Sequence, residues 1–187
     1  LSRIFSLETQ RKRLLRRAPE GPVRDYLSVP FPDESSEIHS VPLLSLDFET
    51  TGLDVRHDRI LSIGHVAIEA GEILLSSARH RLVRADDSLR EESVVIHRIT
   101  DDVAAFGKAQ DEVIADLLQA LTGKVMLAHH SAIECGFLGN ACKQLYGLVP
   151  VFPVIDTLSL ARQWFTSRNK EIAPGDLRLF NLRERYG

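Results

Sequence analysis

The first half of the chain carries the alternation of apolar and polar positions that is typical of β-strands. Segment 43–49 alternates in this way, which predicts a strand with one buried face. Apolar runs over 60–69 and 73–83 predict two further strands. The joint between them, at residues 70–72, is so short that the two strands must form an antiparallel hairpin. The three strands are therefore expected to form a meander.

The second half of the chain changes to the helical period, interrupted by short apolar strands. An apolar stripe over 113–121 followed by Gly123 is typical of an amphipathic helix and its end. This order of elements predicts a mixed α/β sheet, part antiparallel and part parallel, with helices packed on it. Trp164 and Phe165 are expected in the core. The remaining expected elements are a strand at 124–129, a helix over 131–147, a strand at 151–155, a helix from 156 or 157 to 164, and a last helix from about 174 that is still running at 187.

The N-terminal residues differ in composition from the rest. Leucines at helical spacing and a candidate cap, Ser6, predict a helix within residues 1–24, a segment with seven basic and two acidic residues. A proline-rich and then acidic stretch predicts an extended linker that ends at Pro42. We expect residues 1–40 to be a basic arm with its linker, and 41–187 to be the compact domain. The basic helix presents a solvated face or, as the alternative, an arm that binds DNA or docks to a partner.

The overall composition is that of one soluble domain: 187 residues, 21.0 kDa, 44% hydrophobic and 26% charged. A formal net charge of −3 excludes a strongly basic coat for nucleic acid, so any polyanion must be bound locally or through a metal ion. The sequence contains no apolar run of about 18 residues, the length needed for a membrane span, and no apolar core of a signal peptide. Cys135 and Cys142 would lie about 10 Å apart on one helix, too far for a disulfide. We expect a reduced, cytoplasmic protein with no membrane partner.

The sharpest chemical feature is a pair of carboxylates in the first predicted strand. Asp47 and Glu49 are two positions apart, so both side chains point to one face, about 7 Å from each other. Like charges at this spacing repel unless they are paired or bound to a metal, and Mg²⁺ or Mn²⁺ suits hard oxygen ligands. The alternative is a solvated strand end. The turn Thr50, Thr51 and Gly52 follows, and its hydroxyls and amides suit phosphate or sugar oxygens.

The segment 46–53, Leu-Asp-Phe-Glu-Thr-Thr-Gly-Leu, resembles the first motif of the DnaQ-like, DEDD superfamily of 3′–5′ exonucleases. Three weaker similarities follow in the family's order, at 96–100, 129–134 and 155–158. The resemblance runs from about Val41 to the end of the chain. It implies a ribonuclease H-like fold, in which a mixed five-stranded sheet is flanked by helices.

The resemblance also implies roles for the acidic residues. Asp47 would bridge two divalent ions, Mg²⁺ or Mn²⁺, and Glu49 would hold one ion and its water. Glu134 stands where the family usually has an aspartate, and would hold the second ion directly or through water. The alternative for Glu134 is a solvent-facing helix residue.

Further residues are assigned to the substrate by the same resemblance. The turn Thr50–Gly52 would hold the terminal sugar, and Leu53 would wedge against the last base. His97 would touch substrate or be structural. Of the adjacent pair His129 and His130, one is expected near the cleft and the other in the core, and we assign His129 to substrate binding.

Asp156 is expected to cap the helix that follows it rather than to bind metal.

The family's third motif, a histidine or tyrosine base with a final aspartate, is not found. Residues 179–187 resemble the stretch that precedes it. Because the last predicted helix is still running at Gly187, we expect the chain to be cut short of that motif. The alternative is a protein that lacks the base and the fourth carboxylate.

Together these features predict a metal-dependent 3′–5′ exonuclease that releases nucleoside monophosphates from single-stranded DNA ends. The resemblance implies proofreading or repair, with a DNA polymerase or a repair complex as partner. Two alternatives stay open: an RNA 3′ exonuclease of the same fold, and a binding module for nucleic acid or protein.

Overall fold

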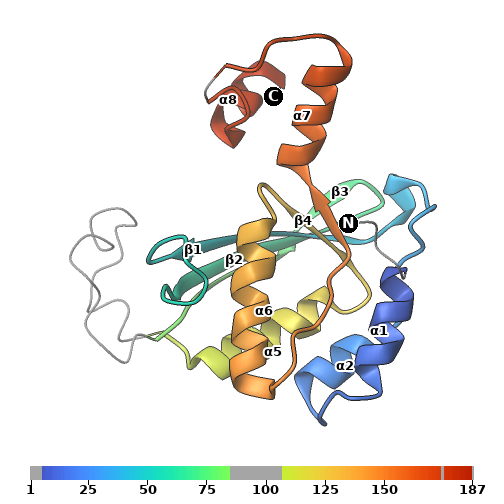
Figure 1. Ribbon diagram of the computed structural model, residues 1–187, viewed down its shortest axis with the longest axis vertical. Helices are drawn as coiled ribbons and strands as arrows, with labels where there is room; N and C mark the ends of the chain where they lie inside the picture. Colours follow the sequence, from blue (N-terminus) through green and yellow to red (C-terminus); the bar gives the residue numbers. More distant parts are fainter. Residues whose placement is uncertain (1–5, 85–106, 174, 187) are drawn as a thin grey trace.

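The computed structural model describes residues 6–84, 107–173 and 175–186, and a five-stranded sheet forms its centre (Figure 1). The strands are β1 Leu43–Thr50, β2 Ile60–Glu69, β3 Glu72–Leu82, β4 Val125–Ala128 and β5 Val154–Asp156. They stand in the order β3-β2-β1-β4-β5. β2 pairs antiparallel with β1 and β3, whereas β4 pairs parallel with β1 and β5. The mixed sheet and the meander expected from the sequence are confirmed.

β1 lies in the middle of the sheet, and its alternate residues face two different surroundings. Leu44, Leu46 and Phe48 are buried in the core, whereas Asp47 is exposed and Glu49 is partly exposed. The pleat of a strand separates these two sets onto opposite faces. The acidic pair therefore lies on the face turned away from the core, as the alternation predicts.

The hairpin between β2 and β3 is a two-residue turn. Glu69 pairs with Glu72 across it, and Ala70 and Gly71 adopt left-handed φ angles of 51° and 80°. Positive φ at both central residues matches the right-handed twist of the flanking strands, which favours this turn. The short joint thus forms the antiparallel hairpin that it predicts.

Helices cover one face of the sheet and extend beyond the other. Figure 1 shows α5 and α6 together on one side of the sheet with α1 and α2 beside them, whereas α7 and α8 project from the opposite side. All the apolar residues of the stripe predicted over 113–121 are buried in α5. The bounds are α1 Leu7–Leu15, α2 Pro22–Ser28, a 3₁₀ turn at Ile38–Ser40, α5 Gln110–Leu121, α6 Ala132–Tyr146, α7 Thr157–Ser167 and α8 Leu179–Tyr186.

The segment before the sheet differs from its prediction. An extended linker is expected from its prolines, but α2 occupies Pro22–Ser28, because a proline at the first position of a helix costs no hydrogen bond. Val23, Tyr26 and Leu27 are buried in the same hydrophobic core as the sheet. The hydroxyl of Tyr26 donates to the carbonyl of Val151 at 3.1 Å. The extended interpretation is therefore wrong for this stretch, which packs against the domain.

The two last helices also correct one core assignment. Phe165 is buried, as expected, but Trp164 is 46% exposed. The guanidinium of Arg168 lies 3.7 Å from the centre of the Trp164 ring. α7 projects from the sheet (Figure 1), and Phe165 is its one buried residue.

Cys135 and Cys142 are both free thiols. None of the helices in the described ranges is long and apolar enough to cross a membrane.

Candidate active site

Asp47 lies over an open part of the sheet. Its partner in the antiparallel ladder is Gly64, which has no side chain to cover it, and a hollow of about 260 Å³ adjoins the pair. Partial burial raises the pKa of the Asp47 carboxyl, and the charge of Glu49 raises it further. The repulsion predicted from the spacing of the two carboxylates is thus present in the structure.

Glu134 brings a third carboxylate to this place from the first turn of α6. The side chain is buried, with 3% of the residue exposed, and its Oε2 atom has no hydrogen-bond partner among the described residues. Burial raises its pKa to about 7, and the charges of Asp47 and Asp156 add to the shift. The solvent-facing alternative for Glu134 is therefore wrong, and the structure places this side chain within the field of Asp47.

These residues suit a divalent cation. Within the described ranges, no group of three or more His, Cys, Asp or Glu side chains is already gathered tightly enough to hold a metal ion. However, a buried carboxylate oxygen without a partner is costly, and a hard cation is the natural ligand for an oxygen set of this kind. The donors Asp47, Glu49 and Glu134 are all carboxylates, so the residues present fit Mg²⁺ or Mn²⁺.

The turn after β1 is built by its own side chains. The Thr50 hydroxyl donates to the carbonyl of Gly52 at 2.7 Å, and the Thr51 hydroxyl donates to Asp58 Oδ1 at 3.0 Å. The other oxygen of Asp58 accepts from the Asp54 amide at 2.8 Å. The two hydroxyls predicted to meet substrate thus hold the turn together, and Leu53 is left 76% exposed at its tip.

Gly52 is required by the same carboxylate. A Cβ atom on Gly52 would lie 2.5 Å from Asp58 Oδ2, closer than side chains tolerate. Asp58 is a residue that the sequence analysis missed. An aspartate inside a polar loop gives no pattern that separates it from its neighbours.

α6 supports this turn as well as carrying Glu134. The Asn140 side chain donates to the carbonyl of Val55 at 2.6 Å. A Cβ atom on Gly136 would lie 2.8 Å from the Val55 side chain, so a larger residue there would require that side chain to shift. Gly136 and Asn140 were also missed. The one available signal was the isolated glycine inside a helix, which often has a packing reason.

His129 is fully engaged within the chain. Its Nδ1 lies 2.8 Å from the Thr157 hydroxyl at the start of α7, and its Nε2 lies 2.8 Å from the carbonyl of Leu177. It therefore ties the end of β4 to the segment that leads into α8. Direct contact of His129 with substrate stays a prediction. His97 lies outside the described residues.

Asp156 caps α7, as predicted. Its Oδ1 accepts from the amides of Leu158 and His130, at 3.0 and 2.9 Å. These hydrogen bonds lower the pKa of the carboxyl against the opposing effect of burial, which raises it. A hollow of about 580 Å³ adjoins this end of the sheet, with His129, His130 and Arg178 in its lining.

Residues 44–187 match the Exonuclease (RNase T) family of proteins. The chain is also similar to the PolC-type DNA polymerase III of Thermotoga petrophila, with 32% identity over 134 residues, and to that of Thermotoga maritima, with 32% identity over 136 residues. These alignments cover 72% and 73% of this chain, and 10% of each polymerase. The chain thus spans about a tenth of the length of the curated relatives it matches.

Solved structures of Exonuclease I share the fold. Escherichia coli Exonuclease I in complex with a dA16 oligonucleotide has a TM-score of 0.61 and 16% identity, over 71% of this chain and 32% of that one. Exonuclease I from Methylocaldum szegediense has a TM-score of 0.59 and 16% identity, over 71% of this chain and 31% of that one. The expected ribonuclease H-like fold is confirmed.

Proposed function

Because the chain belongs to the Exonuclease (RNase T) family, within the DnaQ-like group of 3′–5′ exonucleases, we propose that it hydrolyses the terminal phosphodiester of single-stranded DNA with the help of divalent ions. In this reaction water adds to the phosphorus, the bond to the 3′ oxygen breaks, and a nucleoside monophosphate leaves. The oxygen that departs takes up a proton.

The observation that carries the proposal is the buried Glu134 carboxylate with its unpartnered oxygen, in the field of Asp47. Asp47, Glu49 and Glu134 would hold two ions, Mg²⁺ or Mn²⁺. Bound ions would polarise the phosphate and favour the hydroxide form of the attacking water. Burial raises the pKa values of Asp47 and Glu134, and the charges of Glu49 on Asp47 and of Asp47 on Glu134 add to it, so a bound cation would relieve both effects.

The chain's own surfaces would position the strand end. Leu53, exposed at the tip of the turn held by Asp58, would pack against the last base. The hollow beside His129 and Arg178 would take the nucleotides next to it. DNA is favoured over RNA because the curated relatives are DNA polymerases and one of the solved Exonuclease I structures holds a dA16 oligonucleotide. A polymerase or repair complex is the partner we propose.

The test is digestion of end-labelled DNA and RNA oligonucleotides of the same sequence in Mn²⁺. We expect stepwise shortening of the DNA from its 3′ end. Asp47→Ala is expected to abolish it, because Asp47 is the carboxylate that interacts with both Glu49 and Glu134. Glu69→Ala, which removes an exposed carboxylate from the end of β2, is the matched control and keeps full activity.

Three results would contradict the proposal. Digestion that survives Asp47→Ala would refute the site, and faster digestion of the RNA strand would make the protein an RNA 3′ exonuclease. Binding of either strand without any cleavage would favour the binding module.

A further inference from the structure

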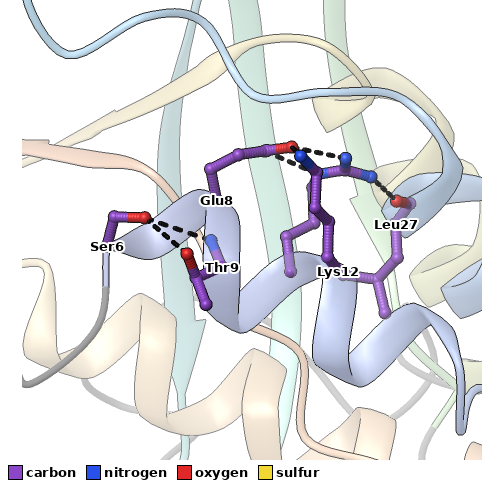
Figure 2. A network of polar contacts seen from close by, with 6 residues as sticks. Ser6, Glu8, Thr9, Lys12 and Leu27 are labelled. Carbon is purple, nitrogen blue, oxygen red and sulfur yellow. Dashed lines mark hydrogen bonds and ion pairs between the residues drawn. The ribbon is translucent and has the colours of Figure 1, made fainter.

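One buried arginine ties helix α1 to helix α2. Arg11 is 3% exposed, and its Nε and Nη2 atoms donate to the Glu8 carboxylate at 2.7 and 2.6 Å. Its third group, Nη1, donates to the carbonyl of Leu27 at the end of α2. Figure 2 shows this network together with Ser6, whose hydroxyl caps the helix by accepting from the Thr9 amide. Arg11 therefore serves the fold, and it orients the rest of α1.

The opposite side of the helix is cationic. We call four exposed residues the basic face: Lys12 and Arg13 of α1, its C-cap residue Arg16, and Arg17, which follows the cap. Lys12 and Arg16 are four positions apart, as are Arg13 and Arg17. Lys12 lies 3.7 Å from Glu8. Across residues 6–84, 107–173 and 175–186, no acidic side chain forms an ion pair with the three arginines. These charges stand on a protein whose formal net charge is −3.

We propose that the basic face binds the phosphate backbone of the nucleic acid whose 3′ end is in the active site. The inference rests on the proposed function for its substrate, but not on cleavage. A helix macrodipole also favours cations in the last turn, but this effect falls off within that turn and needs no cluster of four.

The composition of the face argues for nucleic acid rather than protein. Protein interfaces centre on apolar and aromatic residues. On α1 the apolar residues Leu7, Leu14 and Leu15 all turn inward, and none is exposed. A row of cations without an apolar centre suits a polyanion, which it binds by releasing condensed counterions.

The fold places this face away from the active site. Tyr26 of α2 contacts Val151, ahead of β5, whereas Asp156 at the end of β5 lies in the field of Glu134. The five residue steps from Val151 to Asp156 span about 17 Å when extended. Figure 1 also shows α1 and α2 beside α5 and α6, away from the junction between β4 and α6. Only a strand of several nucleotides can therefore reach both places.

The length of the oligonucleotide and the salt concentration supply the test. Binding of labelled oligothymidylate of about 4 and about 30 nucleotides is measured by fluorescence anisotropy in EDTA, over a range of salt. Arg16→Gln/Arg17→Gln is expected to weaken binding of the long strand at least about fivefold and to reduce its salt slope by about 1.4, or 0.7 for each lost contact. Binding of the short strand is expected to stay unchanged.

Two variants control for charge and for folding. Lys143→Gln/Lys170→Gln removes the same charge from exposed positions elsewhere and keeps wild-type binding. Arg16→Lys/Arg17→Lys keeps the charge and is expected to keep most of the affinity. Equal salt slopes for the glutamine variant and the control would overturn the proposal. So would poly-glutamate that competes as well as DNA, which would make the face a site for acidic proteins.

The outcomes also separate this inference from the proposed function. If the wild-type protein binds the long strand through Arg16 and Arg17 but never digests it in Mn²⁺, the exonuclease proposal fails and this one stands. If digestion proceeds and the glutamine variant binds like the control, only this inference fails.

Discussion

Glu134 is the residue whose chemistry depends most on its surroundings. In the unfolded chain its carboxyl has an ordinary pKa of 4.5, whereas burial and the charges of Asp47 and Asp156 raise the pKa to about 7 in the folded protein. Between these two values the unfolded state binds fewer protons than the folded state, so the free energy of unfolding falls as the pH rises. In the absence of metal, Glu134 is therefore expected to make the wild-type protein less stable at about pH 8 than at about pH 5.

Glu134→Gln is expected to remove this loss of stability at high pH. Relative to wild type, the free energy of unfolding of the variant should rise by about 3 kcal/mol between about pH 5 and pH 8, which is the pKa gap expressed as an energy. Urea denaturation in EDTA measures it. Glu112→Gln, which removes an exposed carboxylate from α5, is the control and should follow wild type. A difference between Glu134→Gln and wild type that does not change with pH would show that Glu134 is not held in a raised-pKa environment.

The sequence could predict some site residues and not others. Asp47 and Glu49 follow from alternation alone, because a strand fixes which of its side chains share a face. Gly136 and Asn140 depend on contacts between α6 and the turn after β1, and the hydrogen bond from Asn140 to Val55 joins positions 85 residues apart. No local pattern encodes such a contact. Glu134 was found only through the resemblance, and its burial was not foreseen.

At the scale of elements, the turn between β1 and β2 is held by one carboxylate. Asp58→Ala would remove the acceptor of the Thr51 hydroxyl and the Asp54 amide, which should lower the free energy of unfolding by about 1–3 kcal/mol. Because Leu53 would lose its fixed position, we expect KM for single-stranded DNA to rise more than kcat falls. Steady-state kinetics and urea denaturation provide the two measurements.

Asp58→Asn distinguishes positioning from charge. Asparagine keeps one acceptor oxygen, so KM in this variant should lie between those of wild type and Asp58→Ala. Mn²⁺ binding measured by calorimetry should be unchanged in both variants. A loss of Mn²⁺ affinity in Asp58→Ala would place Asp58 among the metal ligands instead.

Elements with a strong internal pattern were predicted closely, and those set by tertiary packing were not. β2 begins and ends where its apolar run does, and the stripe of α5 is buried throughout. α2 was missed because its proline was taken to mark an extended segment. The burial of Tyr26 in the core stabilises a helix there. The exposure of Trp164 follows from the position of α7 relative to the sheet. The sequence of the helix alone does not determine that position.

Across the whole molecule, the acidic site and the N-terminal helices lie at different places on the sheet. Glu134 lies in the field of Asp47 and Asp156, the last residue of β5, whereas Tyr26 of α2, the helix to which Arg11 ties α1, contacts Val151 ahead of β5. Such a separation suits the proposed substrate, a single strand of DNA that is bound at one place and cleaved at another. It requires that the N-terminal helices stay fixed to the domain, which is the task of Arg11.

Arg11→Ala tests that attachment. The variant would leave the Leu27 carbonyl without this donor and Glu8 without its close partner, at a cost of about 1–3 kcal/mol in the free energy of unfolding. We expect faster limited proteolysis within residues 7–28, whereas Arg13→Ala, an exposed neighbour on the same helix, should change neither measurement.

The pH dependence of that cost has a definite sign. The hydrogen bond from Arg11 lowers the pKa of Glu8 below 4.5, so the stability that the pair provides is present above this value and is lost as the pH falls through the lower, folded-state pKa. Because Glu8 is partly exposed, solvent screening limits this contribution to below about 1 kcal/mol. The difference between Arg11→Ala and wild type should therefore shrink at acidic pH without vanishing, since the bond to Leu27 does not titrate. A difference that grew on acidification would show that Glu8 opposes the docking of α1 instead of supporting it.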